Sequence, residues 1–277
     1  MTFSADTRLL IIDPQNDFCD LSERDCPAAQ RPALPVPGAH ADMRRLARAL
    51  MAAPGRISRI ACTLDTHDYF DVAHPQYWMQ GNGAEVAPFT EITPESMREG
   101  RFVPRREADR TRTLIYLDAL ARAGRYTLMV WPPHCIDGNW GHQVHDEVHA
   151  ACQAWVQHSG QDILTIHKGM NPYTEHYSAL QAEIADPADP QTGLNTALLD
   201  WVQAADAVWI AGEASSHCVR ATVQHLLVHL PAGHASRITL LTDCMSPVAG
   251  FEHAHEALLR DAQSAGVRLA RAAECFN

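Results

Sequence analysis

The stretch "WIAGEASSHCVRATVQHLL" (209–227) passes from an apolar strand into a helix with an apolar face, through a turn of small residues. Cys218 stands where this helix begins. A helix start presents unpaired backbone N–H groups and the positive end of the peptide dipoles, and both favour a thiolate over a thiol. The position therefore suits a reactive cysteine, and it equally suits a small residue that fits a tight turn.

The same alternation of strand and helix runs along the whole chain. Short runs that are apolar on both faces, as buried parallel strands are, occur six times: 8–13, 58–65, 126–131, 162–167, 206–212 and 237–243. Segments with helical spacing of apolar residues lie among them, at 38–53, 195–205, 217–230 and 255–266. Such alternation forms βαβ units on one sheet. We therefore predict a single Rossmann-like α/β domain over 1–277, a three-layer α/β/α arrangement with a mostly parallel six-stranded sheet.

Two stretches do not fit a minimal α/β unit. Residues 19–37 form a proline-rich loop, and residues 79–112 are rich in glycine, proline and charge without clear periodicity. A long structureless loop in a compact domain is often a lid or an interface element, and it can also be a surface insertion without a role. We expect an insertion at about 79–125.

The bulk composition excludes several classes of partner. The chain has 277 residues and a net charge of −11, which argues against binding to nucleic acid or anionic membranes. No apolar run approaches the roughly 18 residues of a membrane helix, and the N-terminus lacks the pattern of a signal peptide. The eight cysteines form no CxxC pair, which fits reduced thiols in the cytoplasm.

Polar residues follow most of the predicted strands. In an open parallel sheet, ligands bind outside the carboxyl ends of the strands. The polar residues at or just after these ends are Asp13, Asp65, His67, His134, Lys168 and Cys218. Each taken alone is as readily explained as a cap, a solvated charge or a satisfied polar group. Together they predict a site at one edge of the sheet.

Asp13, Lys168 and Cys218 form a chemically complete set for acyl transfer to sulfur followed by hydrolysis. A free thiol has a pKa near 8.5, so only about 3% is thiolate at pH 7. A neighbouring ammonium lowers that pKa, and a carboxylate can take the thiol proton and later hand it to a leaving amine. We expect the backbone N–H groups of Ala214 and Cys218 to hold the oxyanion.

Asp65, His67 and His134 form the second group. Residues i and i+2 of an extended segment point the same way, so Asp65 and His67 can bind a common metal ion. His134 would be a third ligand, and His74 is a candidate for a fourth or an ordinary loop histidine. Imidazole and carboxylate ligands suit zinc, iron or manganese, of which we take zinc as the first expectation.

Six segments in the same order resemble the isochorismatase-like cysteine hydrolases, and within them the nicotinamidases. These segments are "IIDPQNDFC" (11–19), "LPVPGA" (34–39), "LDTH" (64–67), "WPPHC" (131–135), "HKGMNPYTEHYSAL" (167–180) and "GEASSHCV" (212–219). The resemblance implies that Asp13 is the catalytic acid and base, that Lys168 holds the thiolate and that Cys218 is the nucleophile of a thioester mechanism. It also implies a homo-oligomer.

The resemblance further implies how a substrate would bind. In nicotinamidases the metal binds the pyridine nitrogen, and aromatic residues flank the ring. Phe18 and Trp131 match those aromatics, whereas Trp78 is a looser candidate that core packing explains as well.

The nucleophile segment matches the family turn with two departures. The family's cis peptide bond would precede Ala214 here. The departures are Ser216, where the family has an aspartate, and Glu213, at a position that is usually apolar.

Three functions remain open at this point. The first is a metal-containing cysteine amidohydrolase that cleaves a small, nicotinamide-like carboxamide to the acid and ammonia. The second keeps the fold and the cysteine for another amide or carbamoyl substrate, of the ureidoacrylate, carbamoylsarcosine or biuret type, and such relatives generally lack the metal. The third is a ligand-binding or scaffold protein on the same fold.

Overall fold

The computed structural model describes residues 6–277 and is built around one six-stranded sheet. The order is β10–β9–β8–β1–β2–β7, and all neighbours pair in parallel. The strands are β1 (Thr7–Ile12), β2 (Arg59–Asp65), β7 (Leu164–Lys168), β8 (Ala207–Gly212), β9 (Ile238–Leu241) and β10 (Arg268–Ala270). The predicted α/β fold with a six-stranded parallel sheet is confirmed.

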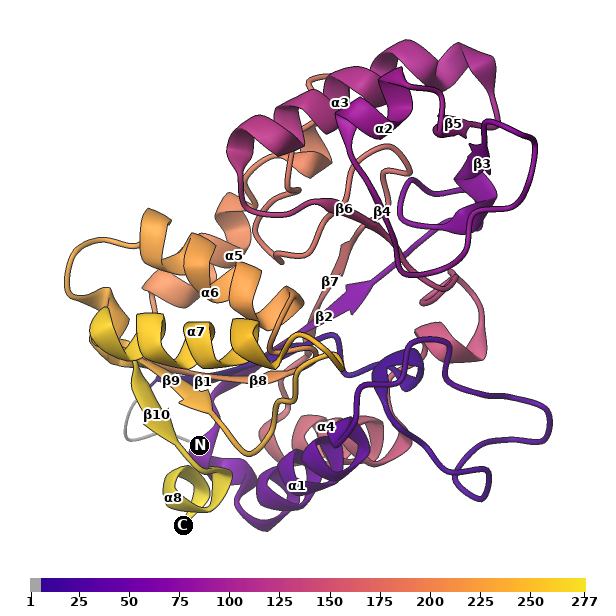
Figure 1. Ribbon diagram of the computed structural model, residues 1–277. Coiled ribbons are helices and arrows are strands. Elements are labelled where there is room, and N and C mark those ends of the chain that lie inside the picture. Colours follow the sequence, from indigo (N-terminus) through magenta and orange to yellow (C-terminus); the bar gives the residue numbers. More distant parts are fainter. Residues whose placement is uncertain (1–5) are drawn as a thin grey trace.

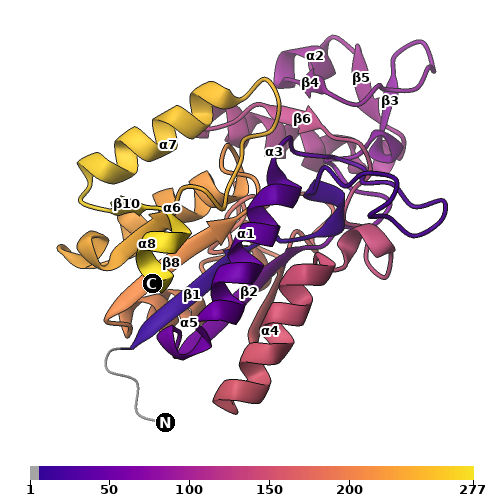
Figure 2. The same ribbon diagram turned by 90° about the horizontal axis from the view of Figure 1, so that it is seen from below.

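Helices cover both faces of this sheet (Figures 1 and 2). One face carries α1 (Ala39–Ala52), α4 (Asp146–Ser159) and α8 (Ala272–Phe276). The other carries α5 (Thr196–Gln203), α6 (Cys218–His229) and α7 (Glu252–Ser264). In α1 the buried side chains of Met43, Leu46 and Leu50 recur every three or four residues, which aligns them on one face. The helical spacing therefore predicted α1, α5, α6 and α7, and it missed α4 and α8.

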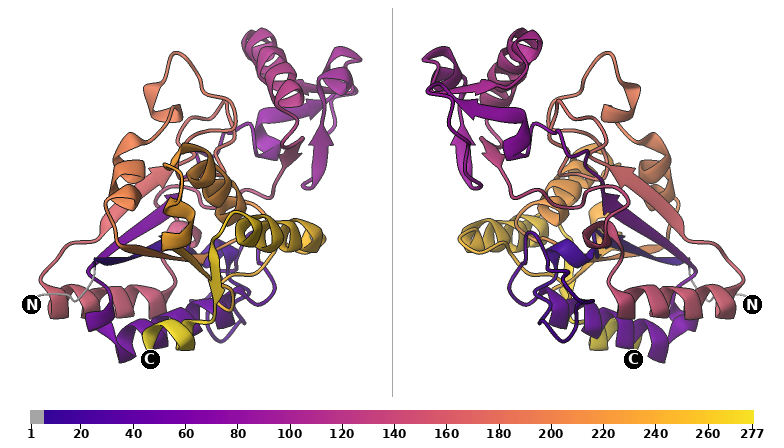
Figure 3. Two further views of the ribbon diagram at one scale, coloured as in Figure 1. Left: turned by 90° about the vertical axis from the view of Figure 1, so that its left-hand side faces the viewer. Right: turned by 90° about the vertical axis from the view of Figure 1, so that its right-hand side faces the viewer.

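A small lobe stands apart from the sheet (Figures 1 and 3). Its elements are β3 (Trp78–Gln80), β4 (Thr90–Ile92), α2 (Pro94–Arg98), β5 (Phe102–Pro104), α3 (Arg110–Ala123) and β6 (Leu128–Val130). Strand β3 pairs with β5 and β4 pairs with β6, both antiparallel. The lobe has an apolar core of its own, in which Trp78, Ile92 and Leu117 are buried.

The expectation of a structureless stretch at 79–112 is wrong, because the lobe orders it. Helix α2 begins with a capping box, in which Thr93 and Ser96 each accept a hydrogen bond from the other's backbone N–H. Helix α3 ends at Ala123, and Gly124 caps it with a φ of 66°. These elements are three to fourteen residues long, so most are too short for periodicity to reveal.

The assignment of 126–131 to the central sheet is also wrong. The middle of this run forms β6, which pairs with β4 in the lobe. The sixth strand of the central sheet is β10. An apolar run reports burial and not the partner strand, so the sequence does not distinguish the two sheets. Strand β10 has three residues, one of them charged, which is too little for an apolar pattern.

The connections are mostly short turns or anchored loops. Single 3-10 turns lie at η1 (Asn16–Phe18), η2 (Pro54–Arg56), η3 (Pro75–Tyr77), η4 (Glu107–Asp109), η5 (Trp140–His142), η6 (Pro190–Thr192) and η7 (His234–Arg237). The proline-rich loop 19–37 is tied back by a bridge between Cys19 and Val36. All eight cysteines are free. Among the described residues, no helix combines the length and apolar character that crossing a membrane requires.

Candidate active site

Three chain segments deliver Asp13, Lys168 and Cys218 to the carboxyl edge of the sheet. Asp13 directly follows β1, Lys168 ends β7, and Cys218 opens α6 after β8. Asp13 has a φ of 44°, which turns the chain out of the strand. Thr63 of β2 holds it there, since the Thr63 hydroxyl donates to Asp13 Oδ1 at 2.5 Å and accepts from the Asp13 N–H at 3.0 Å.

Lys168 is the centre of the site. Its Nζ lies 2.9 Å from Asp13 Oδ2, 2.9 Å from Asp65 Oδ1 and 3.5 Å from Cys218 Sγ. It also donates to the carbonyl of His176 at 3.1 Å. Asp13, Lys168 and Cys218 are 0%, 2% and 5% exposed, so these charges interact with little screening by water. The structure thus brings the predicted acid, amine and sulfur together.

Burial and charge pull the pKa values of these groups in different directions. Burial raises the pKa of the Asp13 carboxyl, and Lys168 only partly offsets this. Burial works against the charged form of Lys168, but the Asp13 and Asp65 carboxylates raise its pKa above the usual range. Burial also raises the pKa of the Cys218 thiol, although the Lys168 ammonium opposes this. The Lys168 ammonium is thus the group that favours a thiolate at Cys218, whereas burial and the charges of Asp13 and Asp65 oppose it.

The turn before Cys218 leaves two backbone donors free. The peptide bond between Glu213 and Ala214 is cis, as the resemblance implies. The N–H of Glu213 donates to the Ile12 carbonyl at 2.8 Å. By contrast, neither the Ala214 N–H nor the Cys218 N–H has an acceptor in the described part of the chain. Both residues line the cavity at the site.

Gly212 allows this turn to pack against β1. Its φ is 122°, and a Cβ added there would lie 1.9 Å from the Ile12 carbonyl oxygen. A side chain at this position would push the turn away from the sheet.

Three buried imidazoles meet beside the Lys168 group. Ligand atoms of His67, His74 and His134 all lie within 4.8 Å of one another. Asp65 Oδ2 is 3.1 Å from His67 Nε2 and 3.5 Å from His134 Nε2, so this carboxylate joins the cluster to Lys168. Burial lowers the pKa of His74, whereas the Asp65 and Asp71 carboxylates outweigh burial at His67 and raise its pKa. Three imidazoles and a carboxylate fit a divalent metal ion such as zinc.

Asp71 is a residue that the sequence reasoning missed. Its Oδ2 lies 3.0 Å from His67 Nδ1, and its Oδ1 accepts the Ala73 N–H at 2.8 Å. A carboxylate on the second nitrogen of a metal-binding imidazole fixes the tautomer and the ring orientation. The spacing of four residues between His67 and Asp71 was its only sequence signal.

A narrow cavity with about 330 Å³ of empty space connects the two groups. Phe18 and Trp131 line it, together with Asp65, His134, Ala214 and Cys218. The sequence did not indicate its other walls, which are Leu34, Glu175, Tyr177, His217 and Val248. The Trp131 indole donates to the Tyr177 hydroxyl at 3.1 Å, which fixes the indole as a wall. Trp78 is instead fully buried in the core of the lobe.

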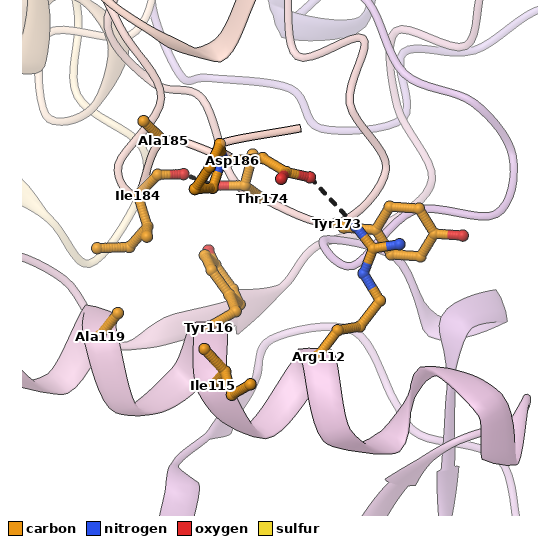
Figure 4. A pocket seen from close by; sticks show the side chains of 10 residues that line it. Arg112, Ile115, Tyr116, Ala119, Tyr173, Thr174, Ile184, Ala185 and Asp186 are labelled. Atoms are coloured by element: carbon orange, nitrogen blue, oxygen red, sulfur yellow. Dashed lines mark hydrogen bonds and ion pairs between the residues drawn. The ribbon is translucent and has the colours of Figure 1, made fainter. Parts of the chain in front are cut away.

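A second, more open cavity lies between α3 and the segment 173–187 (Figure 4). It holds about 520 Å³ of empty space, and its lining is mostly apolar. Arg112 stacks on Tyr173 there and pairs with Asp186 at 3.2 Å. None of the predicted site residues lines this cavity, so the smaller one is the candidate active site.

Comparison with known proteins finds relatives by sequence and by fold. No family model matches the chain. A nicotinamidase of Escherichia coli (strain K12) is 30% identical over 115 residues, which are 41% of this chain and 44% of that protein. The chain thus matches less than half the length of this curated relative.

Solved structures match over nearly the whole chain. A nicotinamidase and pyrazinamidase of Acinetobacter baumanii has a TM-score of 0.63 at 16% identity and covers 99% of both chains. The pyrazinamidase of Pyrococcus horikoshii in complex with zinc has a TM-score of 0.55 at 19% identity, covering 96% of this chain and 99% of its own. The chain therefore has the fold of the nicotinamidases and pyrazinamidases, the group that its motifs resemble.

Proposed function

We propose that the protein is a metal-containing cysteine amidohydrolase that cleaves a small, nicotinamide-like carboxamide to the acid and ammonia through a thioester. The observation that carries this proposal is the position of the Lys168 ammonium, in contact with Asp13, Asp65 and the Cys218 sulfur at once. A scaffold or binding protein has no need to bury such a set of charges, because burying each ion costs several kcal/mol.

Acylation uses Asp13 first as a base and then as an acid. Asp13 takes the proton of the Cys218 thiol, which faces it, and the sulfur attacks the carboxamide carbon. The carbonyl oxygen becomes an oxyanion that accepts hydrogen bonds from the free N–H groups of Ala214 and Cys218. Asp13 then gives the proton to the amide nitrogen, the C–N bond breaks and ammonia leaves.

Deacylation runs through the same groups in reverse. Asp13 takes a proton from a water molecule that attacks the thioester, and the oxyanion forms again at the same donors. The sulfur leaves and receives the proton from Asp13, which frees the acid. Lys168 stabilises the negative charge on sulfur and carboxylate throughout.

His67, His74, His134 and Asp65 would hold the metal ion. An ion bound there would supply a site for a ring nitrogen of the substrate, directly or through water. The zinc complex of the Pyrococcus horikoshii relative supports zinc as the first candidate. Phe18 and Trp131 would flank the ring. The buried histidine group favours this function over a metal-free hydrolase of carbamoyl substrates.

The test is a screen for ammonia release from nicotinamide, pyrazinamide and a panel of carbamoyl compounds. We expect release from the pyridine or pyrazine carboxamides, and we expect Cys218→Ala to abolish it while Cys26→Ala, at a half-buried loop position, retains it. Release from none of the compounds by metal-loaded protein would refute the proposal. Turnover of a carbamoyl compound alone would reassign the substrate.

Three further expectations stay predictions: one domain with an insertion at about 79–125, a homo-oligomer, and a cytoplasmic location.

A further inference from the structure

Hydrogen bonds tie the turn that carries the nucleophile to the loop 243–248. Glu213 Oε2 accepts the Ser246 N–H at 3.0 Å, and the Ser215 N–H donates to the Ser246 carbonyl at 2.9 Å. Ser216 Oγ accepts the Val248 N–H at 3.0 Å. The two residues that depart from the family pattern, Glu213 and Ser216, therefore both bind the same loop.

A second carboxyl group reaches the same loop from α1. The Ser246 hydroxyl donates to Asp42 Oδ2 at 2.6 Å, and Arg45 donates to Asp42 Oδ1 at 2.9 Å. Glu213 and Asp42 thus converge on one serine, and they are 0% and 6% exposed. Glu213 Oε1 is fully buried and has no hydrogen-bond partner among the described residues when both groups are taken as acceptors.

The unpartnered oxygen is satisfied if it carries a hydrogen. Two ionised carboxylates side by side in a buried site would repel each other, whereas a carboxyl group donates to a neighbouring carboxylate. We propose that Glu213 is protonated and donates to Asp42, and that this acid pair positions the turn that carries the Ala214 N–H and Cys218. The catalytic consequence rests on the proposed function, but the shared proton does not.

The surroundings of Glu213 support the assignment of the proton. Burial raises the pKa of Glu213, and the charge of Asp42 raises it further. The other titratable and charged groups that face the pair come from α1, from the segment after β1, from the loop after β9 and from α7. They are Cys19, Asp20, Arg45, Asp243, Cys244 and His255. Arg45 is already shared by Asp42 and Asp243, so a second negative charge would have no cation of its own.

Thermal unfolding across pH tests the shared proton without any substrate. The folded-state pKa of Glu213 lies above its unfolded value, so the stability that the proton confers is present at low pH and is lost as pH rises. Between the two pKa values, the unfolding equilibrium constant should rise by up to about tenfold per pH unit. In Glu213→Gln the side-chain amide donates to Asp42 and does not titrate. This variant should therefore not lose stability in this way as pH rises.

The experiment compares melting temperatures of the wild type, Glu213→Gln and the control Glu274→Gln, at an exposed position of α8, from about pH 5 to about pH 9. As pH rises, we expect the melting temperatures of the wild type and the control to fall together relative to that of Glu213→Gln. Parallel curves of melting temperature against pH for all three proteins would contradict the shared proton.

Turnover tests the positioning role. We expect Glu213→Gln to keep kcat at neutral pH and to lose an alkaline decline that the wild type shows. Glu213→Ala should lower kcat by about tenfold to a hundredfold at every pH, because a misplaced turn misaligns the oxyanion donors. Unchanged kcat in Glu213→Ala would overturn the role of the pair. A wild type without activity would refute the proposed function, while the melting curves would still decide the shared proton.

Discussion

The carboxyl edge of the sheet buries charged side chains, whereas the small lobe keeps its ion pairs at the surface. At the edge, Asp13, Asp65 and Lys168 are at most 4% exposed, and they pair within the interior. In the lobe, ion pairs such as Arg98–Asp118 lie at the surface, and most of the buried side chains are apolar. Since exposed pairs contribute little and buried ions are costly, only the edge carries an electrostatic cost that stability does not explain.

The two cavities repeat this contrast. The cavity beside α3 has about 520 Å³ of empty space and a mostly apolar lining, whereas the one at the edge has about 330 Å³ and is lined by a thiol, two imidazoles and two carboxyl groups. Volume alone does not identify the site, since two further cavities are larger than either of these. The groups that could form bonds with a substrate identify the site.

The strongest test of the contrast is the same substitution in both regions. Asp13→Asn should lower kcat by about 10²- to 10⁴-fold, because an amide cannot take the thiol proton. Its fold should persist, since the carbonyl oxygen of an asparagine can still accept from Thr63 and Lys168 keeps its contact with Asp65. Ammonia release measures kcat, and circular dichroism checks the fold.

The matched control is Asp118→Asn, which removes one charge of the exposed pair with Arg98. It should change neither kcat nor stability beyond about 1 kcal/mol. If folded Asp13→Asn kept wild-type turnover, the edge would lose its catalytic assignment.

A smaller effect is expected at Asp71, whose carboxylate contacts His67 of the candidate metal site. Asp71→Asn should weaken binding of zinc by about 10- to 100-fold, because it loses the carboxylate that orients His67. Competition with a chromogenic chelator measures this affinity. Asp68→Asn, at an exposed position three residues earlier, should bind zinc as the wild type does. Equal affinities in all three proteins would show that Asp71 serves only the backbone of Ala73.

Much of the edge could be predicted because it follows from local rules. Parallel strands end at one edge, so Asp13, Asp65 and Lys168 were expected to be neighbours from their places after apolar runs. The helix beginning at Cys218 followed from spacing alone. The role of each group as acid, base or nucleophile remains a prediction that the experiments above test.

The rest could not be predicted because it depends on contacts between distant segments. Nothing local in 126–131 indicates that β6 pairs with β4, and nothing near Glu213 indicates Asp42 as its neighbour. The elements of the lobe become stable only when packed together, so their short sequences carry weak patterns.

The smallest effect separates two tryptophans. Trp78→Phe removes the indole that donates to the buried Val72 carbonyl at 2.8 Å, which should cost about 1–3 kcal/mol of unfolding free energy. Because Trp78 is fully buried in the lobe's core and absent from the walls of the site, KM and kcat of the folded protein should not change. Trp131→Phe, at a wall of the site, should raise KM. Urea unfolding and steady-state kinetics measure both. A raised KM in Trp78→Phe would show that the substrate site extends into the lobe, and the two regions would then no longer differ in function.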